Sequence, residues 1–372
     1  MSDCETIYEI GLSMTKRMTA ETAFRLQDLG LTAEDFFRME TPDLTAALGM
    51  KPGHGFERMD RDEALFKARK EYETMQKHNI KGVSLMDPRY PVRLYQTPDA
   101  PLFLYILGDE DLEGDHVINI VGTRHCTTYG TKFCNTLIEG LASYFPDLTV
   151  VSGLAYGIDT SAHRAALDNN VKTVAVVAHG LHRIYPPENR DLAAEIVRRG
   201  GSIVSEYPFG ENCFRQRFLE RNRIVAGLSE ATIVAESGIK GGALATANIA
   251  NSYGRDVFAV PGRVNDEASA GCNNLIRRDK ARLIGSAADL TEALGWTPME
   301  TGMTVKQRNL FPELEGDEKT VYELLRFTDG AMHFDQIHMK TLIPVARLMS
   351  VLGELEFDGI INRLPGNKFE IG

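Results

Sequence analysis

The chain repeats one pattern six times between Ile118 and Phe258: a short apolar strand runs into a glycine-rich or polar turn and then into a helix. This alternation predicts a mostly parallel sheet covered by helices on both faces. In such a sheet the turns lie together at the carboxyl edge, where helix N-termini present unpaired N–H groups. The six turns are residues 122–130, 153–159, 179–187, 206–209, 237–242 and 261–263. Together they predict a rim that binds phosphate groups.

The net charge of −11 argues against a nucleic-acid partner, because phosphate binders usually carry a basic surface. The charge is unevenly distributed, however. Residues 310–372 hold eleven Asp or Glu against six Lys or Arg and so contribute −5. Residues 212–223, by contrast, hold four arginines against Glu220 alone. A local basic groove on an acidic protein is therefore compatible with nucleic-acid binding.

The sequence contains no recognisable targeting or membrane segment. No apolar run approaches about 18 residues, and the first ten residues are acidic. We therefore expect a cytoplasmic protein without a membrane partner. The five cysteines include no CxxC pair, and the nine histidines do not cluster with them at zinc-ligand spacing. We expect reduced cysteines, no metal and no cofactor.

Seven short motifs follow one another in a fixed order. They are VGTR at 121–124 with YG at 129–130, SGLAYGID at 152–159 with AH at 162–163, YPPEN at 185–189, SEYP at 205–208, RNRIVAGL at 221–228, VPG at 260–262 and GCNNLI at 271–276. With these motifs the chain resembles the DprA (Smf) family, bacterial proteins that bind single-stranded DNA and hand it to the RecA recombinase. The resemblance is specific from about Gly82 to about Leu294.

The resemblance implies an α/β protein with three parts. An extended Rossmann-like core with a mostly parallel sheet is expected at 78–294, after a small helical domain of the SAM or helix-hairpin-helix kind at 1–77. A linker at 295–316 and a winged helix at 317–372 follow. The residue patterns agree, since four short helices are indicated before residue 78, and three helices and a terminal hairpin after residue 317.

We expect single-stranded DNA to contact the rim. Arg124 follows a strand end in an anion-binding turn and suits bidentate phosphate contact; the alternative is a surface arginine that caps a carbonyl. Phe218 lies among arginines and suits base stacking; the alternative is a ring that anchors a loop to the core. The predicted DNA-binding residues are Gly122, Thr123, Arg124, Gly153, Arg183, Arg215, Arg217, Phe218, Arg221, Asn222, Arg223, Lys240, Gly241 and Gly242.

Two further interpretations concern these segments. Asn222 is expected to order a turn before a helix at 224–228. Asp159 and His163 lie four residues apart on a helix and so share a face. They are either an acid/base pair or, as we favour, a carboxylate that satisfies backbone donors with a buried histidine behind it.

The resemblance also implies a homodimer formed through the end of the core. Leu275, Ile276 and Leu283 lie there among charged residues and are the predicted interface. The alternative is that Ile276 packs inside its own protomer.

Two other classes of function compete with DNA binding. Related Rossmann-like enzymes cleave nucleoside monophosphates with a catalytic glutamate in a PGGxGTxxE loop. The comparable stretch at 241–250 supplies Asn248 and no acid, so we expect no enzyme. A sensor that binds a small nucleotide on the rim needs no catalytic residue, and the sequence leaves that alternative open.

Overall fold

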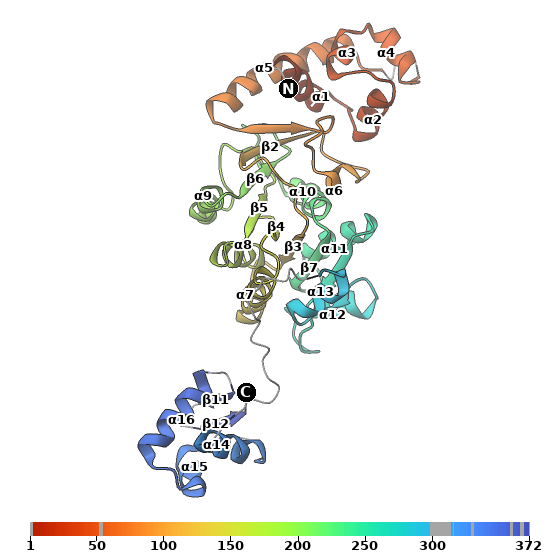
Figure 1. The fold of residues 1–372 in the computed structure, drawn as a ribbon. Coiled ribbons are helices and arrows are strands. Elements are labelled where there is room, and N and C mark those ends of the chain that lie inside the picture. The colour runs from red at the N-terminus through yellow and green to blue at the C-terminus, as the bar shows by residue number, and fades with distance from the viewer. Residues whose placement is uncertain are drawn as a thin grey trace. The chain divides into compact units, whose positions relative to one another are not determined.

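The computed structural model describes residues 3–51, 55–297, 314, 316–328, 331–357, 360–364 and 368–371 (Figure 1). The chain divides into two compact units, Met1–Met299 and Glu300–Gly372. Their boundary falls within the predicted linker 295–316, most of which lies outside the described residues. Since residues 1–77 belong to the first compact unit, a separate helical domain there stays a prediction.

The first unit is built on one sheet, which has nine strands in the described part of the chain. Its strand order is β1-β2-β6-β5-β4-β3-β7-β8-β9. All neighbours from β6 to β9 are parallel, while β1 and β2 are antiparallel additions at one edge. The strands are β1 (Lys81–Ser84), β2 (Phe103–Gly108), β3 (Val117–Gly122), β4 (Thr149–Ser152), β5 (Lys172–Val176), β6 (Ser202–Ser205), β7 (Ala231–Glu236), β8 (Asp256–Ala259) and β9 (Arg282–Leu283). The strand order reverses between β3 and β7, which is where ligands bind in open α/β sheets.

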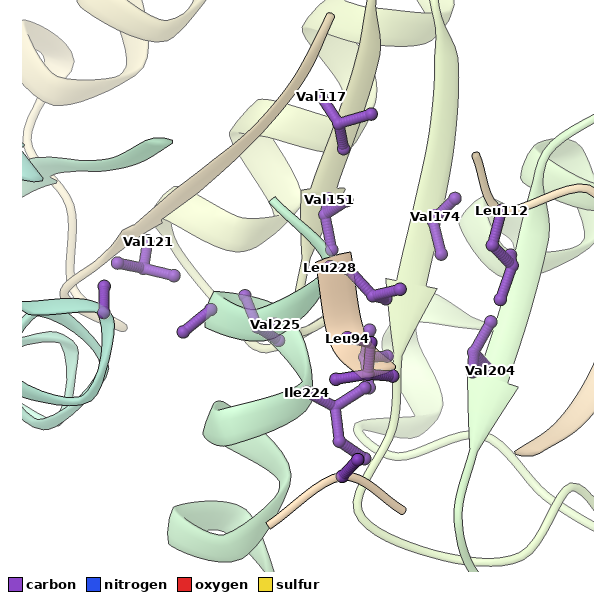
Figure 2. Packing of buried hydrophobic residues seen from close by; sticks show 14 of the residues in the cluster. Leu94, Leu112, Val117, Val121, Val151, Val174, Val204, Ile224, Val225 and Leu228 are labelled. Carbon is purple, nitrogen blue, oxygen red and sulfur yellow. The ribbon is translucent and has the colours of Figure 1, made fainter. Parts of the chain in front are cut away.

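Helices cover both faces of this sheet. They are α6 (Val92–Tyr95), α7 (Thr128–Ala142), α8 (Ile158–Asp168), the 3₁₀ helix η1 (Pro187–Asn189), α9 (Arg190–Arg198), α10 (Arg215–Leu228), α11 (Ala243–Ser252), α12 (Ala270–Arg277) and α13 (Ala287–Leu294). Successive residues of a strand point to opposite faces, and β3 shows the result. Val117 and Val121 pack with α6, α10 and α11 (Figure 2), whereas Ile118 and Ile120 pack with α7 and α8.

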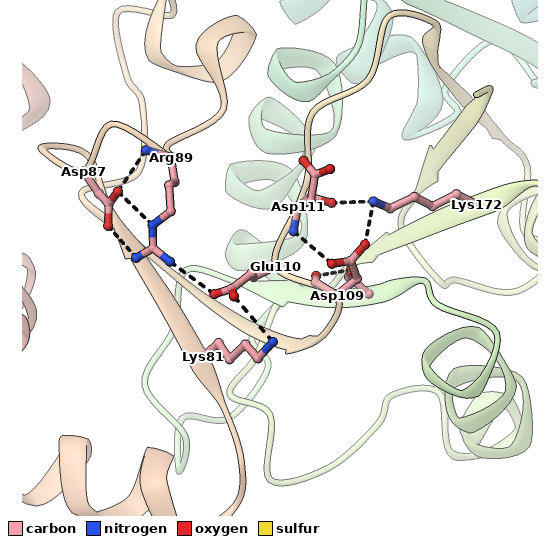
Figure 3. Close-up of polar contacts among 8 residues, drawn as sticks. Lys81, Asp87, Arg89, Asp109, Glu110, Asp111 and Lys172 are labelled. Carbon is pink, nitrogen blue, oxygen red and sulfur yellow. Dashed lines mark hydrogen bonds and ion pairs between the residues drawn. The ribbon is translucent and has the colours of Figure 1, made fainter. Parts of the chain in front are cut away.

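The antiparallel edge of the sheet carries ion pairs. Arg89 pairs with Asp87 at 2.7 Å and with Glu110 at 3.4 Å, and Lys81 of β1 approaches Glu110 at 3.6 Å (Figure 3). Lys172 of β5 pairs with Asp109, the first residue after β2, at 2.8 Å. Each exposed pair adds little stability, but charges along an edge strand discourage pairing with another chain.

Five helices precede the sheet: α1 (Asp3–Met14), α2 (Ala20–Asp28), α3 (Ala33–Arg38), α4 (Thr41–Ala47) and α5 (Arg58–Lys77). The sequence predicted four of them and missed α1. Thr32 and Asp35 form a capping box that begins α3. Apolar residues of α1 and α5 pack on Phe103 and Tyr105 of β2, so these helices lie against the antiparallel edge of the sheet.

The second unit contains the three predicted helices and, in its described residues, a three-stranded antiparallel sheet of order β10-β12-β11. The elements are α14 (Gly316–Arg326), β10 (Met332–His333), α15 (Phe334–Thr341), α16 (Val345–Phe357), β11 (Ile361–Leu364) and β12 (Lys368–Ile371). Val321, Ile337, Leu348 and Phe369 share its separate apolar core. Residues 365–367, which join the two strands of the predicted terminal hairpin, lie outside the described residues. This arrangement agrees with the predicted winged helix.

Candidate nucleic-acid interface

A groove of about 740 Å³ opens at the carboxyl edge of the sheet, where the strand order reverses. It runs over the ends of β3 and β7 and along α10. Ten of the fourteen predicted DNA-binding residues line it: Gly122, Thr123, Arg124, Arg215, Phe218, Arg221, Asn222, Lys240, Gly241 and Gly242. Among the described residues of its wall, four arginines and lysines face one acid, Asp159. The groove is therefore locally basic on an acidic protein.

Arg124 and Phe218 lie close together among the residues that line the groove. Arg124 is exposed in the turn after β3, and its Cζ atom lies 5.5 Å from the centroid of the Phe218 ring. The Phe218 ring is half-buried, and its centroid lies 5.8 Å from that of Tyr185. A guanidinium beside two rings can hold a phosphate while a base stacks on an aromatic face.

Arg221 forms part of the groove floor and is only 5% exposed. Its Nη1 donates to the Val176 carbonyl at 3.0 Å, while Nε has no partner among the described residues. Gly153 makes this position possible, because a Cβ there would lie 1.6 Å from Nη1 of Arg221. Burial lowers the pKa of Arg221, and the nearby Asp159 carboxylate opposes that shift. Arg221 therefore supports the groove from beneath.

Asp159 satisfies backbone donors at the start of α8. Its Oδ2 accepts the Ala155 N–H at 3.2 Å. Burial raises the pKa of Asp159, and the Arg221 guanidinium acts against the rise. His163 is buried behind it, with Nδ1 2.7 Å from the Thr173 hydroxyl, and burial lowers the pKa of His163 to about 3. Both side chains thus lie as the structural interpretation has them, a carboxylate on a backbone donor with a buried histidine behind it.

The turn between β7 and α11 forms the far wall of the groove. Lys240 is exposed there, ahead of the glycine pair 241–242. Gly242 is the N-cap of α11 and makes no side-chain capping bond, while the Leu244 and Ala245 N–H groups donate to the Gly241 and Gly242 carbonyls. A helix start of this kind, beside a lysine, favours an anion.

The start of α7 is different, because the protein's own carboxylate occupies it. Glu236 ends β7, is fully buried, and accepts the Thr127 N–H through Oε2 at 2.8 Å. A Cβ at Gly130 would lie 2.4 Å from the same oxygen. In dinucleotide-binding Rossmann folds the helix after the first strand holds the pyrophosphate. Here a carboxylate stands at that helix N-terminus.

Four predicted residues do not line the groove. Gly153 lies beneath it, against Arg221. Arg183 donates to the Cys213 sulfur at 3.4 Å. Arg217 pairs with Glu211 at 2.8 Å, and Arg223 pairs with Glu206.

Arg217 and Arg223 lie outside the groove because the whole basic run is part of one helix. The expectation of a turn at Asn222 before a helix at 224–228 was wrong, since α10 is continuous from Arg215. At 100° per residue, arginines spaced two apart point in different directions. Only part of the basic run can therefore face the groove.

Sequence reasoning missed several groove residues. Tyr185 is the main one: it lines the groove beside Phe218, yet in the sequence it stands out only as part of the YPPEN motif. Its place in the turn after β5 was an available signal, because turns after parallel strands meet at one edge. The other unpredicted lining residues include His125, Cys213, Leu219 and Thr246.

The predicted dimer residues differ in exposure. Leu275 is 3% exposed and belongs to the core of its own protomer, so its side chain is not on the surface. Ile276 is partly buried against the same core, as the alternative interpretation had it. Leu283 is 54% exposed. The dimer interface stays a prediction that now depends mainly on Leu283.

Three general features hold for the described residues. No group of three or more His, Cys, Asp or Glu side chains there is arranged to hold a metal ion. No helix in the same part of the chain is long and apolar enough to cross a membrane. The five cysteines are free.

Two family models match the chain. Residues 81–295 match that of DNA recombination-mediator protein A. Residues 308–367 match that of the DprA winged helix domain.

Curated relatives extend the similarity over most of the chain. Protein Smf of Synechocystis sp. is 32% identical over 360 residues, which cover 87% of this chain and 89% of that protein. The DNA processing protein DprA of Streptococcus pneumoniae is 42% identical over 207 residues, which cover 56% of this chain and 72% of that protein.

Two solved structures resemble the fold. DprA from Streptococcus pneumoniae matches with a TM-score of 0.64 and 34% identity, covering 77% of this chain and 97% of that one. DNA processing protein A from Helicobacter pylori, whose structure concerns its single-stranded DNA binding mode, matches with a TM-score of 0.52 and 30% identity over 58% of this chain and 95% of that one. These likenesses confirm the predicted fold class.

Proposed function

Because the chain belongs to the family of DNA recombination-mediator protein A, or DprA, we propose that its groove binds single-stranded DNA. The observation that carries this proposal is the Arg124 guanidinium over the Phe218 ring, with Tyr185 beside it. Stacking on a ring needs an exposed base face, which duplex DNA hides. The Helicobacter pylori relative, whose single-stranded DNA binding mode has been described, supports the same assignment.

The electrostatics of the groove favour a polyanion. Four arginines and lysines against the buried Asp159 give a local excess of positive charge, and the start of α11 adds the positive end of its helix dipole. With about three to five phosphates contacted, the logarithm of the affinity for single strands falls against that of salt with a slope of about −2 to −4.

The same groove is poorly suited to the two competing functions. Asp159, the one acid among its described lining residues, is held by a backbone N–H and lies against Arg221. Asn248, at the place of the enzymes' catalytic glutamate, donates to the Leu244 carbonyl and accepts from Lys280. At the α7 N-terminus, where a Rossmann-like nucleotide site would hold a phosphate, Glu236 already accepts the Thr127 N–H.

By the same family membership we propose that the protein protects single strands, promotes loading of the RecA recombinase and acts as a homodimer. The exposed Leu283 at the end of the core is available to a second copy. Formation of RecA filaments on a single strand, with and without this protein, tests the recombinase part of the proposal.

The decisive experiment compares labelled oligo-dT with a duplex of equal length at several salt concentrations. Single strands are expected to bind far more tightly at matched salt, and nucleoside monophosphates are expected to remain uncleaved. Equal affinity for duplex and single strand would contradict the groove assignment, and release of a free base from a nucleotide would favour the enzyme.

A further inference from the structure

The loop 206–214 connects β6 with α10 and leads into the groove wall. It ends at Phe214, the N-cap of α10, and Cys213 and Arg215 on either side of that residue line the groove wall. Phe214 provides no side-chain cap, so the start of α10 is not fixed by the usual capping contact. The position of Arg215 therefore depends on what holds the loop before it.

Phe209 is the residue of this loop that α5 and the residue after it contact. The Phe209 N–H donates to Oε1 of Glu71 at 2.6 Å. The His78 ring, at the end of α5, stacks on the Phe209 ring with centroids 4.4 Å apart and planes 23° apart. Both contacts come from the N-terminal helices, more than 120 residues away in sequence.

The turn after β5 holds the opposite side of the loop. The Phe209 carbonyl accepts hydrogen bonds from the His182 N–H and ring, and the Gly180 N–H donates to the Glu211 carbonyl at 2.8 Å. A Cβ at Gly180 would lie 2.1–2.2 Å from the carbonyl oxygens of Pro208 and Phe209. The loop thus lies directly on this turn, with no space in which to shift toward it.

The contacts continue from Phe209 into the first turn of α10. Arg217 donates through Nη2 to Glu211 at 2.8 Å and through Nη1 to the Asn212 carbonyl. Its Cζ lies 5.1 Å from the Phe214 ring centroid and 4.4 Å from that of Tyr207. An unbroken set of contacts thus leads from α5 to the helix start that carries Arg215.

From this geometry we infer that Glu71 and His78 are positioning residues for the groove: acting through Phe209, they hold the loop 206–214 and thereby fix Arg215 where a DNA phosphate binds. The inference rests on the proposed function and adds a role for the N-terminal helices in it. An arginine side chain that is already ordered loses less conformational entropy when it binds a phosphate. Its contact therefore contributes more to the affinity than that of a mobile arginine.

The first test measures oligo-dT affinity of full-length variants. Glu71→Ala and His78→Ala are each expected to weaken binding about three- to tenfold, within the range for loosening one contact of a network. Glu71→Gln keeps a carbonyl acceptor for the Phe209 N–H and should bind like the wild type. Glu73→Ala, which removes the same charge from an exposed position of α5, is the matched control and should have no effect.

A double-mutant cycle separates positioning from general destabilisation. In an Arg215→Ala background, Glu71→Ala should produce no further loss, because the residue it positions is gone. The inference is overturned if the two losses are fully additive. It is also overturned if Glu71→Ala binds oligo-dT like the wild type, or if Glu71→Gln binds as weakly as Glu71→Ala. Thermal unfolding of each variant identifies any that fail to fold.

Hydrogen exchange tests the inference without DNA. Peptides covering the loop 206–214 should exchange faster in Glu71→Ala than in the wild type and in Glu73→Ala. Unchanged exchange would show that Glu71 does not hold the loop, and would overturn the inference. Absence of oligo-dT binding by the wild type with faster exchange in Glu71→Ala would instead contradict the proposed function and leave the holding role intact.

Discussion

Replacing Phe218 by alanine should weaken the binding of single-stranded DNA without changing its salt dependence. A base stacked on a ring contributes about 1–3 kcal/mol. The Phe218 ring is half-buried, and Arg124 and Tyr185 lie near it at 5.5 and 5.8 Å. Only part of its surface is therefore free, which places the loss at about 1–2 kcal/mol, or about 5- to 30-fold in Kd.

Arg124→Ala should behave differently, because it removes a charge rather than a ring. The salt slope should become shallower by about 0.7, the value for one phosphate contact on a single strand. Because the guanidinium lies over the Phe218 ring, the two losses should also be coupled by about 0.5–1 kcal/mol in a double-mutant cycle.

Fluorescence anisotropy of labelled oligo-dT at four or more salt concentrations measures both quantities. Phe218→Leu keeps the apolar packing without the aromatic face, and should lose affinity while unfolding at the wild-type temperature. Phe66→Ala removes a ring that is 59% exposed on α5 and serves as the control. If Phe218→Leu binds normally while Phe218→Ala unfolds, the ring is a core anchor and the stacking argument is refuted.

Three further predictions concern stability and assembly. Burial raises the pKa of Glu9 to about 7 from its ordinary 4.5, so the protein should lose stability as pH rises through that interval, and Glu9→Gln should stabilise it at pH 8 by about 1–3 kcal/mol but not near pH 4.5, measured by chemical denaturation. Gly153→Ala should cost about 1–3 kcal/mol, since its Cβ displaces the Arg221 guanidinium; an unchanged melting temperature would contradict this. Leu283→Glu should yield folded monomers in sedimentation velocity, whereas a persistent dimer would place the interface elsewhere.

Strands β3 to β8 were predictable because each is a short apolar run that ends in a turn residue. Ile118–Val121 is buried on both faces, and its alternate residues supply two separate cores. In a parallel sheet the turns after the strands meet at one edge, so the sequence alone places Arg124 and Lys240 in one site.

The course of α10 could not be predicted in the same way. Residues 215–223 contain few apolar residues, so no 3.6-residue period revealed that the helix begins at Arg215. Without the helix, the four arginines looked equivalent. Burial of Arg221 depends on the missing side chain of Gly153, which lies 68 residues earlier and which sequence spacing does not connect to it. The ion pair of Arg223 with Glu206 depends on tertiary contacts in the same way.

The carboxylate of Glu236 has a consequence for competition inside a cell. Free nucleotides are abundant there, and an open α7 N-terminus on a Rossmann-like sheet would attract their phosphates. Glu236 is covalently part of the protein, so its carboxylate is present at that helix N-terminus at every nucleotide concentration. Under the proposed function, this carboxylate disfavours a mononucleotide phosphate at the centre of the sheet, while a single strand would reach the neighbouring groove with several linked phosphates and bases.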